Sequence, residues 1–216
     1  MNEKIVTKGI CNKCKQIVSI RAAKSHITKC LNQDIEDSFD AFLIKVQWPH
    51  KNPIYWLYLS VPFKSKLEDL DLFLREIWLE CCSHLSQFII NHKRYSSNFE
   101  PNSFFRFEEF SMAIRSEKVL VPGLKFTHEY DFGSTTELLL EVVGLMKTVA
   151  NKEISVIIQN QEPEFKCISC GKKAKMISST EGDCFCASCV KEEDDDELFL
   201  LPLVNSPRTG VCGYTG

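Results

Sequence analysis

Hydrophobic and polar positions repeat with two different periods along the chain, and the changes of period mark the predicted elements. Apolar, aromatic and β-branched residues that alternate with polar ones, or form short runs, are typical of strands. Such segments predict strands over 38–47, 54–62, 84–95, 124–132, 136–144 and 152–160. The pattern therefore predicts a mostly antiparallel sheet of five or six strands.

A helical period appears between the second and third predicted strands, in residues 65–80. Apolar residues lie three or four positions apart there, at Leu67, Leu70, Leu74, Ile77 and Trp78. This spacing predicts a helix with one stripe in the core, and Ser65 and Glu68 fit a capping box at its start. Residues 96–118 break both periods, apart from a short helix predicted over 107–114. The predicted fold class is α+β, with one or two helices on a face of the sheet.

Composition indicates a globular protein with an unusual number of cysteines. The chain has 216 residues, of which 44% are hydrophobic, and 15 of these are phenylalanines that can fill a core. The stretch "MNEKIVTKGICNK" lacks the apolar run of a signal peptide, and no segment approaches the roughly 20 apolar residues that cross a bilayer. We therefore expect a cytoplasmic protein without membrane contact. In a reducing compartment, 11 cysteines indicate thiolates on a metal rather than disulfides.

Four cysteines near the end of the chain have the spacing of a zinc ribbon. Cys167 and Cys170 form one CxxC turn, Cys186 and Cys189 form another, and 15 residues separate the pairs. A short strand over 172–178 and a turn over 179–183 would return the second pair to the first. Four thiolates close a tetrahedral zinc site with no open position, which makes the zinc structural rather than catalytic.

Two alternatives remain open for these cysteines. Cys184 could replace Cys186 as a ligand, although the CxxC spacing favours Cys186 and leaves Cys184 as a spare thiol. The cysteines could also be ordinary buried residues, but that interpretation gives no reason for their paired spacing.

A second set of four candidate ligands lies near the N-terminus. Cys11 and Cys14 form a CxxC turn, and His26 and Cys30 follow within a helix predicted over 19–31. Ser19 is the predicted N-cap of this helix, and residues four apart share a helix face. The set predicts a CCHC-type zinc finger, so that two structural zinc ions are expected per chain. The alternative is that His26 is a surface histidine and the thiols are free.

The finger is a basic island in an acidic chain. Residues 1–33 carry seven lysines and arginines against one acid, while the net charge of the whole chain is −3. Arg21, Lys24 and Lys29 are candidate contacts to nucleic-acid phosphate, although one finger is too small to select a sequence alone. A protein partner on Ile20 and Ile27, or plain solvation, stays equally open. We interpret the acidic run 191–197 as a solvated linker.

Catalytic candidates cluster in two short motifs of the central region. Strand alternation places Glu129 and Asp131 on one face and His128 on the other, so the two carboxylates are candidates for cation binding or acid–base chemistry. The alternative is that Asp131 caps the turn at Gly133, with Glu129 on the solvated face.

His84 and its neighbours are further candidates. His84 could take part in the same chemistry, or it could be packed or pair with a backbone carbonyl. Cys81 and Cys82 lie close to His84, but no third group that would orient a base is evident, so we expect both cysteines to be buried packing residues. The sequence contains no phosphate loop and no dinucleotide fingerprint.

Three segments carry a resemblance to a known family. "PIYWLYLSVPFKSKLEDLDLFLREIW", "CSHLSQFII" and "HEYDFGSTTELLLEV" together resemble the plasmid pRiA4b ORF-3-like domain, and the match spans about 36–160. The resemblance implies a small α+β domain of a kind known from bacteria, archaea and some mobile-element neighbourhoods. In many members an acid and a tryptophan follow the YDFG motif, whereas this chain has Ser134 and Thr135. The closing "LPLVNSPRTGVCGYTG" is similar to tails of zinc-bearing members.

These observations predict four regions and a class of function. The regions are a CCHC-type finger, a pRiA4b ORF-3-like domain, a four-cysteine ribbon, and an acidic linker with the C-terminal tail, over 1–33, 36–160, 164–190 and 191–216. The predicted function is that of a zinc-binding, non-catalytic adaptor that contacts protein or nucleic acid, with no small-molecule substrate indicated. The alternative is a metal-dependent hydrolase or nuclease that uses Glu129 and Asp131.

Overall fold

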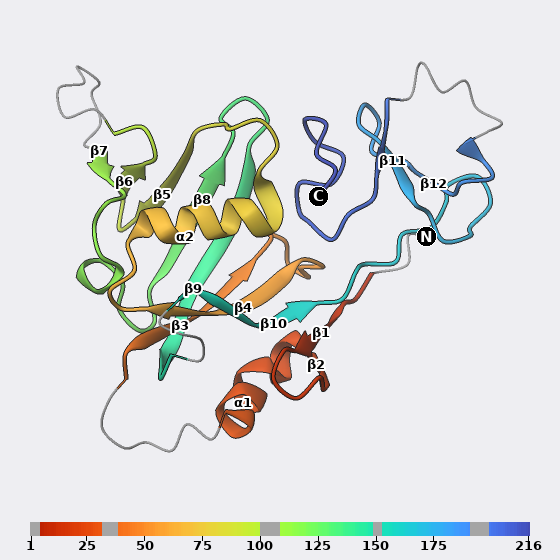
Figure 1. The fold of residues 1–216 in the computed structure, drawn as a ribbon. Helices are drawn as coiled ribbons and strands as arrows, with labels where there is room; N and C mark the ends of the chain where they lie inside the picture. Colours follow the sequence, from red (N-terminus) through yellow and green to blue (C-terminus); the bar gives the residue numbers. More distant parts are fainter. Residues whose placement is uncertain (1–4, 32–38, 100–108, 149–152, 191–198) are drawn as a thin grey trace.

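The structure is a computed structural model that describes residues 5–31, 39–99, 109–148, 153–190 and 199–216 (Figure 1). Within these residues, ten strands form one sheet in the order β2-β1-β10-β4-β3-β9-β8-β5-β6-β7, and three form a second sheet in the order β12-β11-β13. Every pairing is antiparallel except that of β6 with β7. The predicted α+β class with a mostly antiparallel sheet is confirmed.

The elements have the following bounds. The strands of the large sheet are β1 (Lys8–Cys11), β2 (Ile17–Ser19), β3 (Ala41–Gln47), β4 (Trp56–Pro62), β5 (Ser86–Ile90), β6 (Lys93–Ser96), β7 (Glu109–Ser111), β8 (Lys125–Tyr130), β9 (Thr136–Met146) and β10 (Ser155–Asn160). The small sheet contains β11 (Met176–Ser178), β12 (Cys184–Phe185) and β13 (Leu200–Pro202). The helices are α1 (Ile20–Cys30), α2 (Leu67–Leu74), the π-helix η1 (Arg75–Leu79) and the 3-10 helix η2 (Ser116–Lys118).

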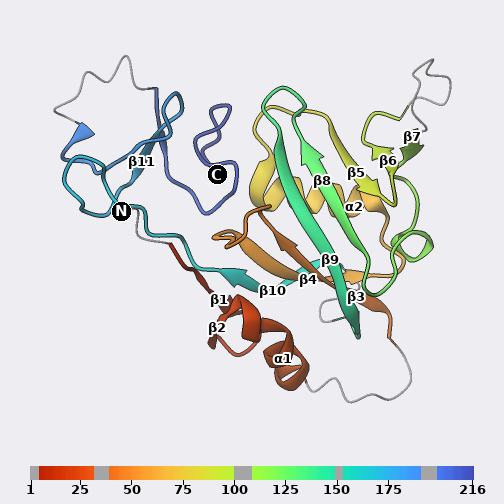
Figure 2. The same cartoon turned by 180° about the vertical axis from the view of Figure 1, so that it is seen from behind.

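Two apolar clusters cover the two faces of the large sheet. Strand β4 is buried along its whole length because alternate residues enter different clusters. Leu57 and Leu59 pack with the leucines of α2 on one face, while Trp56 and Tyr58 pack with Ile27 of α1 on the other. Figures 1 and 2 show the two helices on opposite sides of the sheet.

The N-terminal hairpin of β1 and β2 extends the large sheet and accounts for two of the four strands beyond the six that were predicted. Strand β1 pairs with β10 from Gly9 to Cys11. A Cβ atom at Gly9 would lie 2.4 Å from Trp56 and 2.7 Å from Ile158, so only glycine permits this approach. The Trp56 indole donates to Thr7 Oγ1 at 3.0 Å. The boundaries of the four regions stay predictions. The backbone pairing of β1 with β10 joins the finger region to the central region.

Three local predictions were wrong. The strand expected over 84–95 is the hairpin of β5 and β6, because Asn91 and His92 both take positive φ in a two-residue turn. The described part of the helix expected over 107–114 contains β7, which pairs with β6. The capping box of α2 lies one residue later than expected, since the Lys66 backbone N–H donates to Asp69 Oδ2 at 2.7 Å.

Candidate metal centres

The four predicted ligands of the N-terminal finger converge. The ligand atoms of Cys11, Cys14, His26 and Cys30 all lie within 4.8 Å of one another. The sulfurs of Cys11 and Cys30 are 3.9 Å apart, and the Cys14 sulfur lies 3.4 Å from His26 Nε2. Tetrahedral zinc requires about 3.8 Å between two sulfurs and about 3.6 Å between sulfur and nitrogen. The finger therefore has the donor set and the spacing of a closed metal site.

Local structure explains how the finger ligands meet. Cys11 ends β1, and Lys15 takes positive φ (61°) where the chain leaves the turn that holds Cys14. The predicted N-cap is confirmed, because Ser19 Oγ accepts from the Ala22 N–H at 3.3 Å. The helix then presents His26 and Cys30 on one face, as their four-residue spacing predicts.

Electrostatics in the finger favour a cation among the thiols. The backbone N–H of Gln16 lowers the pKa of Cys14. Burial, together with the neighbouring thiols of Cys14 and Cys11, raises the pKa of Cys30 to about 11. Adjacent thiolates repel each other, so a bound divalent metal would relieve the repulsion and release the thiol protons.

The four ribbon cysteines also converge. Cys167, Cys170, Cys186 and Cys189 place their sulfurs within 4.8 Å of one another, and those of Cys170 and Cys186 are 3.6 Å apart. The predicted hairpin is present as β11 and β12, and it returns the second pair to the first. Gly171 takes a φ of 71° where the chain leaves the first turn.

Backbone donors stabilise thiolates in the ribbon. The N–H groups of Cys186, Cys170 and Ser169 favour the thiolate of Cys167, so its pKa falls to about 6 despite burial. The thiols of Cys170 and Cys186 raise the pKa of Cys189 to about 12. Cys184 is not a member of this cluster and lies on β12, the returning strand.

A third cluster was missed by the sequence analysis. Cys81, Cys82, His84 and Cys212 also place their ligand atoms within 4.8 Å of one another. The expectation that Cys81 and Cys82 are buried packing residues was wrong for Cys82, which is exposed, whereas Cys81 is half-buried and packs against the core. His84 Nε2 lies 3.3 Å from the Cys212 sulfur and 3.5 Å from Asp131 Oδ2. The available signal was a local Cys-Cys-Ser-His group and one unassigned cysteine in the tail.

The candidate nucleic-acid contacts lie on the surface of α1. Arg21, Lys24 and Lys29 are exposed. In contrast, Ile27 is 2% exposed and packs in the core, so its side chain is not presented to a protein partner. The exposed apolar side chains of this N-terminal region include Ile17 on the edge strand β2, at 53%, and Val6, at 76%.

The two candidate carboxylates are held by different partners. Glu129 Oε2 accepts from Gln87 Nε2 at 2.6 Å. Asp131 Oδ1 accepts from the Gly133 N–H at 3.0 Å, which confirms the alternative that Asp131 caps this turn. Asp131 Oδ2 pairs with Arg208 Nη2 at 2.6 Å. Both carboxylates are therefore engaged within the chain.

His128 lies on the opposite face of β8 from Glu129, as strand alternation predicts, and it is fully buried. Its Nε2 atom is 2.6 Å from Asp71 Oδ1 on α2. Burial alone would raise the pKa of Asp71, but the hydrogen bond and charge of His128 outweigh burial and lower it. This pair joins α2 to the sheet.

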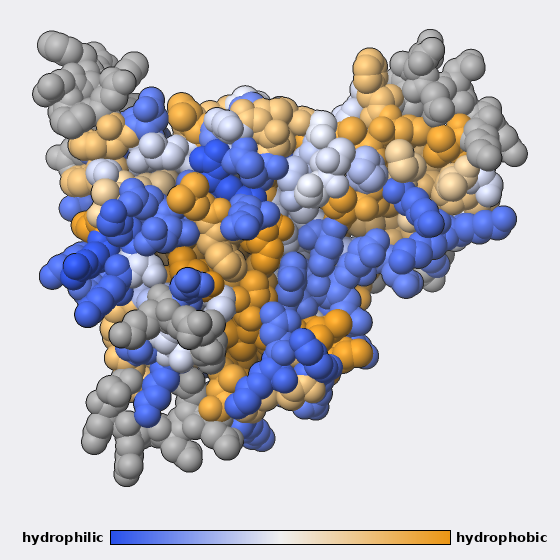
Figure 3. Space-filling model, in the orientation of Figure 1, coloured by the Kyte–Doolittle hydropathy of each residue, from blue (hydrophilic) through white to orange (hydrophobic). Residues whose placement is uncertain are grey.

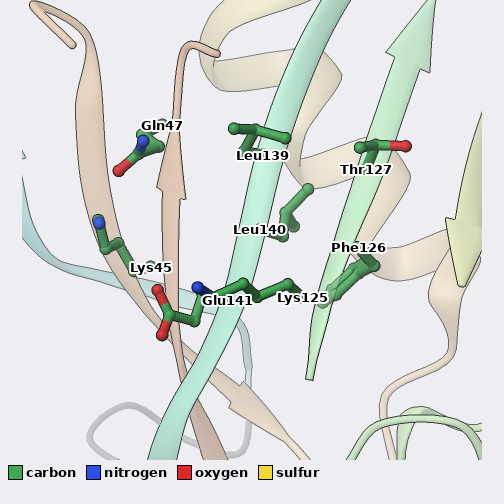
Figure 4. A pocket seen from close by; sticks show the side chains of 8 residues that line it. All are labelled: Lys45, Gln47, Lys125, Phe126, Thr127, Leu139, Leu140 and Glu141. Atoms are coloured by element: carbon green, nitrogen blue, oxygen red, sulfur yellow. The ribbon is translucent and has the colours of Figure 1, made fainter. Parts of the chain in front are cut away.

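A hollow of about 310 Å³ lies on the face of β3, β8 and β9 (Figure 4). Glu141 on β9 lies between its two cross-strand neighbours, Lys45 on β3 and Lys125 on β8. The residues that line the hollow are Lys45, Gln47, Lys125, Phe126, Thr127, Leu139, Leu140 and Glu141. Among these residues there is one carboxylate and no histidine or cysteine, so the lining provides neither paired acids nor a nucleophile with its base.

The sequence matches no family model and no curated protein. Among solved structures it is similar to the crystal structure of a protein of unknown function, MM3350, from Methanosarcina mazei Go1. The two are 13% identical, with a TM-score of 0.45 over 59% of this chain and 71% of that one. A likeness at this level supports neither a family nor a function, so the resemblance to the pRiA4b ORF-3-like domain stays a prediction. No helix among the described residues combines the length and apolar character that a membrane crossing needs.

Proposed function

We propose that the protein is a zinc-binding, non-catalytic adaptor whose finger and ribbon each hold one structural zinc ion. The observation that carries this proposal is the convergence of two complete four-ligand sets at the spacing of tetrahedral zinc. Four protein ligands fill the coordination sphere of zinc and leave no position for a substrate or a reactive water. Such ions stabilise small modules that lack a large core of their own.

The alternative, a hydrolase or nuclease based on Glu129 and Asp131, has less support. A catalytic carboxylate needs free oxygen lone pairs that point into an accessible hollow. Asp131 is 5% exposed and bonded to Arg208 and Gly133, while Glu129 is bonded to Gln87. Neither residue lines the hollow on the sheet face.

Two kinds of surface support an adaptor role. The exposed cations Arg21 and Lys24 lie one turn apart on α1 and suit a phosphate backbone. Hydrophobic side chains gather over the small sheet in Figure 3. Phe199, which precedes β13, is 66% exposed, and Ile168, whose N–H donates to the Cys184 carbonyl of β12, is 61% exposed. We propose the cytoplasm as the location, because none of the eleven cysteines forms a disulfide and a reducing compartment favours thiolates on a metal.

The test is a titration of labelled duplex and single-stranded DNA at low and near-physiological salt. Nucleic-acid binding through the finger predicts weak affinity that falls steeply with salt, and a flatter salt dependence in the Arg21→Gln, Lys24→Gln double variant. Lys51→Gln, Lys64→Gln is the matched control, because both lysines are exposed on the central sheet domain. If the protein binds no DNA at low salt, the nucleic-acid half of the proposal fails and a protein partner is left.

A further inference from the structure

We propose that Cys81, Cys82, His84 and Cys212 bind a third zinc ion, and that this ion fastens the C-terminal tail, residues 199–216, to the central sheet. The four ligand atoms meet the same proximity as those of the finger and the ribbon. The separation of 3.3 Å between His84 Nε2 and the Cys212 sulfur is close to the about 3.6 Å of a tetrahedral zinc site. Zinc binding would release the three thiol protons to solvent.

The loop that carries three of the ligands is held by Tyr130. The Tyr130 hydroxyl accepts from the backbone N–H groups of Cys81 at 3.4 Å and His84 at 3.3 Å, and it donates to Glu80 Oε1 at 3.0 Å. Glu80 Oε1 also accepts from the Ser83 N–H at 2.6 Å, and Ser83 takes a φ of 58°. The loop after η1 is thus folded around the Tyr130 hydroxyl. These hydrogen bonds position Cys81, Cys82 and His84 before a metal binds.

The fourth ligand arrives on the tail, which is anchored independently. Ser206 Oγ donates to the Trp78 carbonyl at the end of η1. Arg208 is fully buried, pairs with Asp131 and donates to Thr136 Oγ1 at 3.0 Å. Four residues later, Cys212 has a φ of 51° and turns back toward the loop. Tyr130, at the end of β8, therefore holds the loop that carries three of the ligands. The adjacent Asp131 holds, through Arg208, the tail that carries Cys212.

The charge around the cluster suits a metal bound by thiolates. Three thiolates and one zinc ion carry a net charge of −1. The Arg208 Nε–H donates to the Cys81 sulfur at 3.4 Å, which is the kind of supporting hydrogen bond that metal-bound sulfur accepts.

Exposure distinguishes this cluster from a packing role and from the other two sites. Cysteines that serve as apolar filler are buried, whereas Cys82 and Cys212 are exposed. The finger and the ribbon each include a buried cysteine, Cys11 and Cys167 respectively, but the third cluster includes none. A chelator should therefore reach the third ion first.

The test is the zinc content of the full chain, purified in reductant without added metal. We expect three equivalents for the wild type, two for Cys212→Ser, and three for the matched control Cys184→Ser, because Cys184 belongs to none of the clusters. The equivalent that a colorimetric chelator removes first should be absent from Cys212→Ser. Two equivalents in both the wild type and Cys212→Ser would overturn the third site alone, whereas one or none in the wild type would overturn the adaptor's structural zinc ions as well.

A second variant guards against a folding defect in Cys212→Ser. His84→Cys keeps four ligands, so it should retain three equivalents, and after cobalt substitution its absorption should gain sulfur-to-cobalt intensity relative to the wild type. Three equivalents in Cys212→Ser, or an unchanged cobalt spectrum in His84→Cys, would overturn the proposal. A disulfide from Cys212 to Cys81 or Cys82 in the reduced preparation, seen as the loss of two hydrogens in the intact mass, would also overturn it.

Discussion

Arg208 and Asp131 form an ion pair across 77 positions of sequence, with 2.6 Å between Nη2 and Oδ2. The Arg208 side chain is fully buried, and that of Asp131 is 7% exposed. Burial alone would raise the pKa of Asp131, but Arg208 and the backbone N–H groups of Ser134 and Gly133 outweigh burial and lower it. The carboxylate therefore compensates a buried cation and ties the tail to the end of β8.

Asp131→Asn should destabilise the fold strongly, because it leaves the charge of Arg208 buried without its partner. We expect a loss of about 3 kcal/mol in the free energy of unfolding, measured by urea unfolding with tryptophan fluorescence. Glu129→Gln is the control, because Glu129 is more exposed and contacts the neutral Gln87. Equal losses in the two variants would contradict the importance of the buried pair.

Gly9→Ala should loosen the finger from the large sheet. Its Cβ would lie 2.4 Å from the ring of Trp56, which is fully buried and has no room to move away. We expect a cost of about 1–3 kcal/mol in urea unfolding, as for other overpacked sites. Gly144→Ala on β9 is the matched control, because no heavy atom lies within 4 Å of its Cβ position. A neutral Gly9→Ala would mean that β1 does not dock as the structure shows.

Cys186→Ser should remove zinc from the ribbon, whereas Cys184→Ser should leave the zinc content unchanged. Cys186 repeats the turn of Cys167 and its sulfur lies 3.6 Å from that of Cys170, while Cys184 lies before that turn on β12. Elemental analysis of both variants checks this. If the two variants exchanged their zinc contents, the assignment of the ligand would be wrong.

Asp71 should make stability depend on acid pH. Its pKa in the folded protein is lowered because His128 and Arg75 outweigh burial. A lowered pKa contributes stability that is present above the unfolded value of about 4 and is lost as the pH falls through the folded value. The difference in unfolding free energy between wild type and Asp71→Asn should therefore be constant near pH 5 and shrink toward about pH 3. A difference that is the same at both pH values would contradict this role, and zinc release affects both proteins alike.

Local signals predicted the parts of the molecule that local structure determines. The CxxC turns, the Ser19 cap and the four-residue step from His26 to Cys30 each depend on neighbours within one turn of chain. For the same reason the ribbon hairpin and the leucine stripe of α2 were found. Both predicted ligand sets are therefore present as clusters.

Long-range contacts explain what the sequence did not reveal. The third cluster joins Cys81, Cys82 and His84 to Cys212 across more than 100 positions, and no spacing rule links them. The docking of Gly9 against Trp56 is equally remote, so no local pattern indicates that the finger hairpin joins the large sheet. Asp131 was a candidate site residue because it is a carboxylate in a short polar motif. Its partner Arg208 lies in the tail, so the sequence did not reveal the ion pair.

Zinc K-edge X-ray absorption of the full chain tests most directly whether the metal sites are closed and structural. Four protein ligands in each of the clusters predict a four-coordinate shell dominated by sulfur at about 2.3 Å, with a minor nitrogen component near about 2.0–2.1 Å. The spectrum should not change when substrate-like phosphate esters or carboxylates are added, because no coordination position is open. A shell with five or six light-atom ligands, or one that changes with these anions, would contradict a structural role for the zinc.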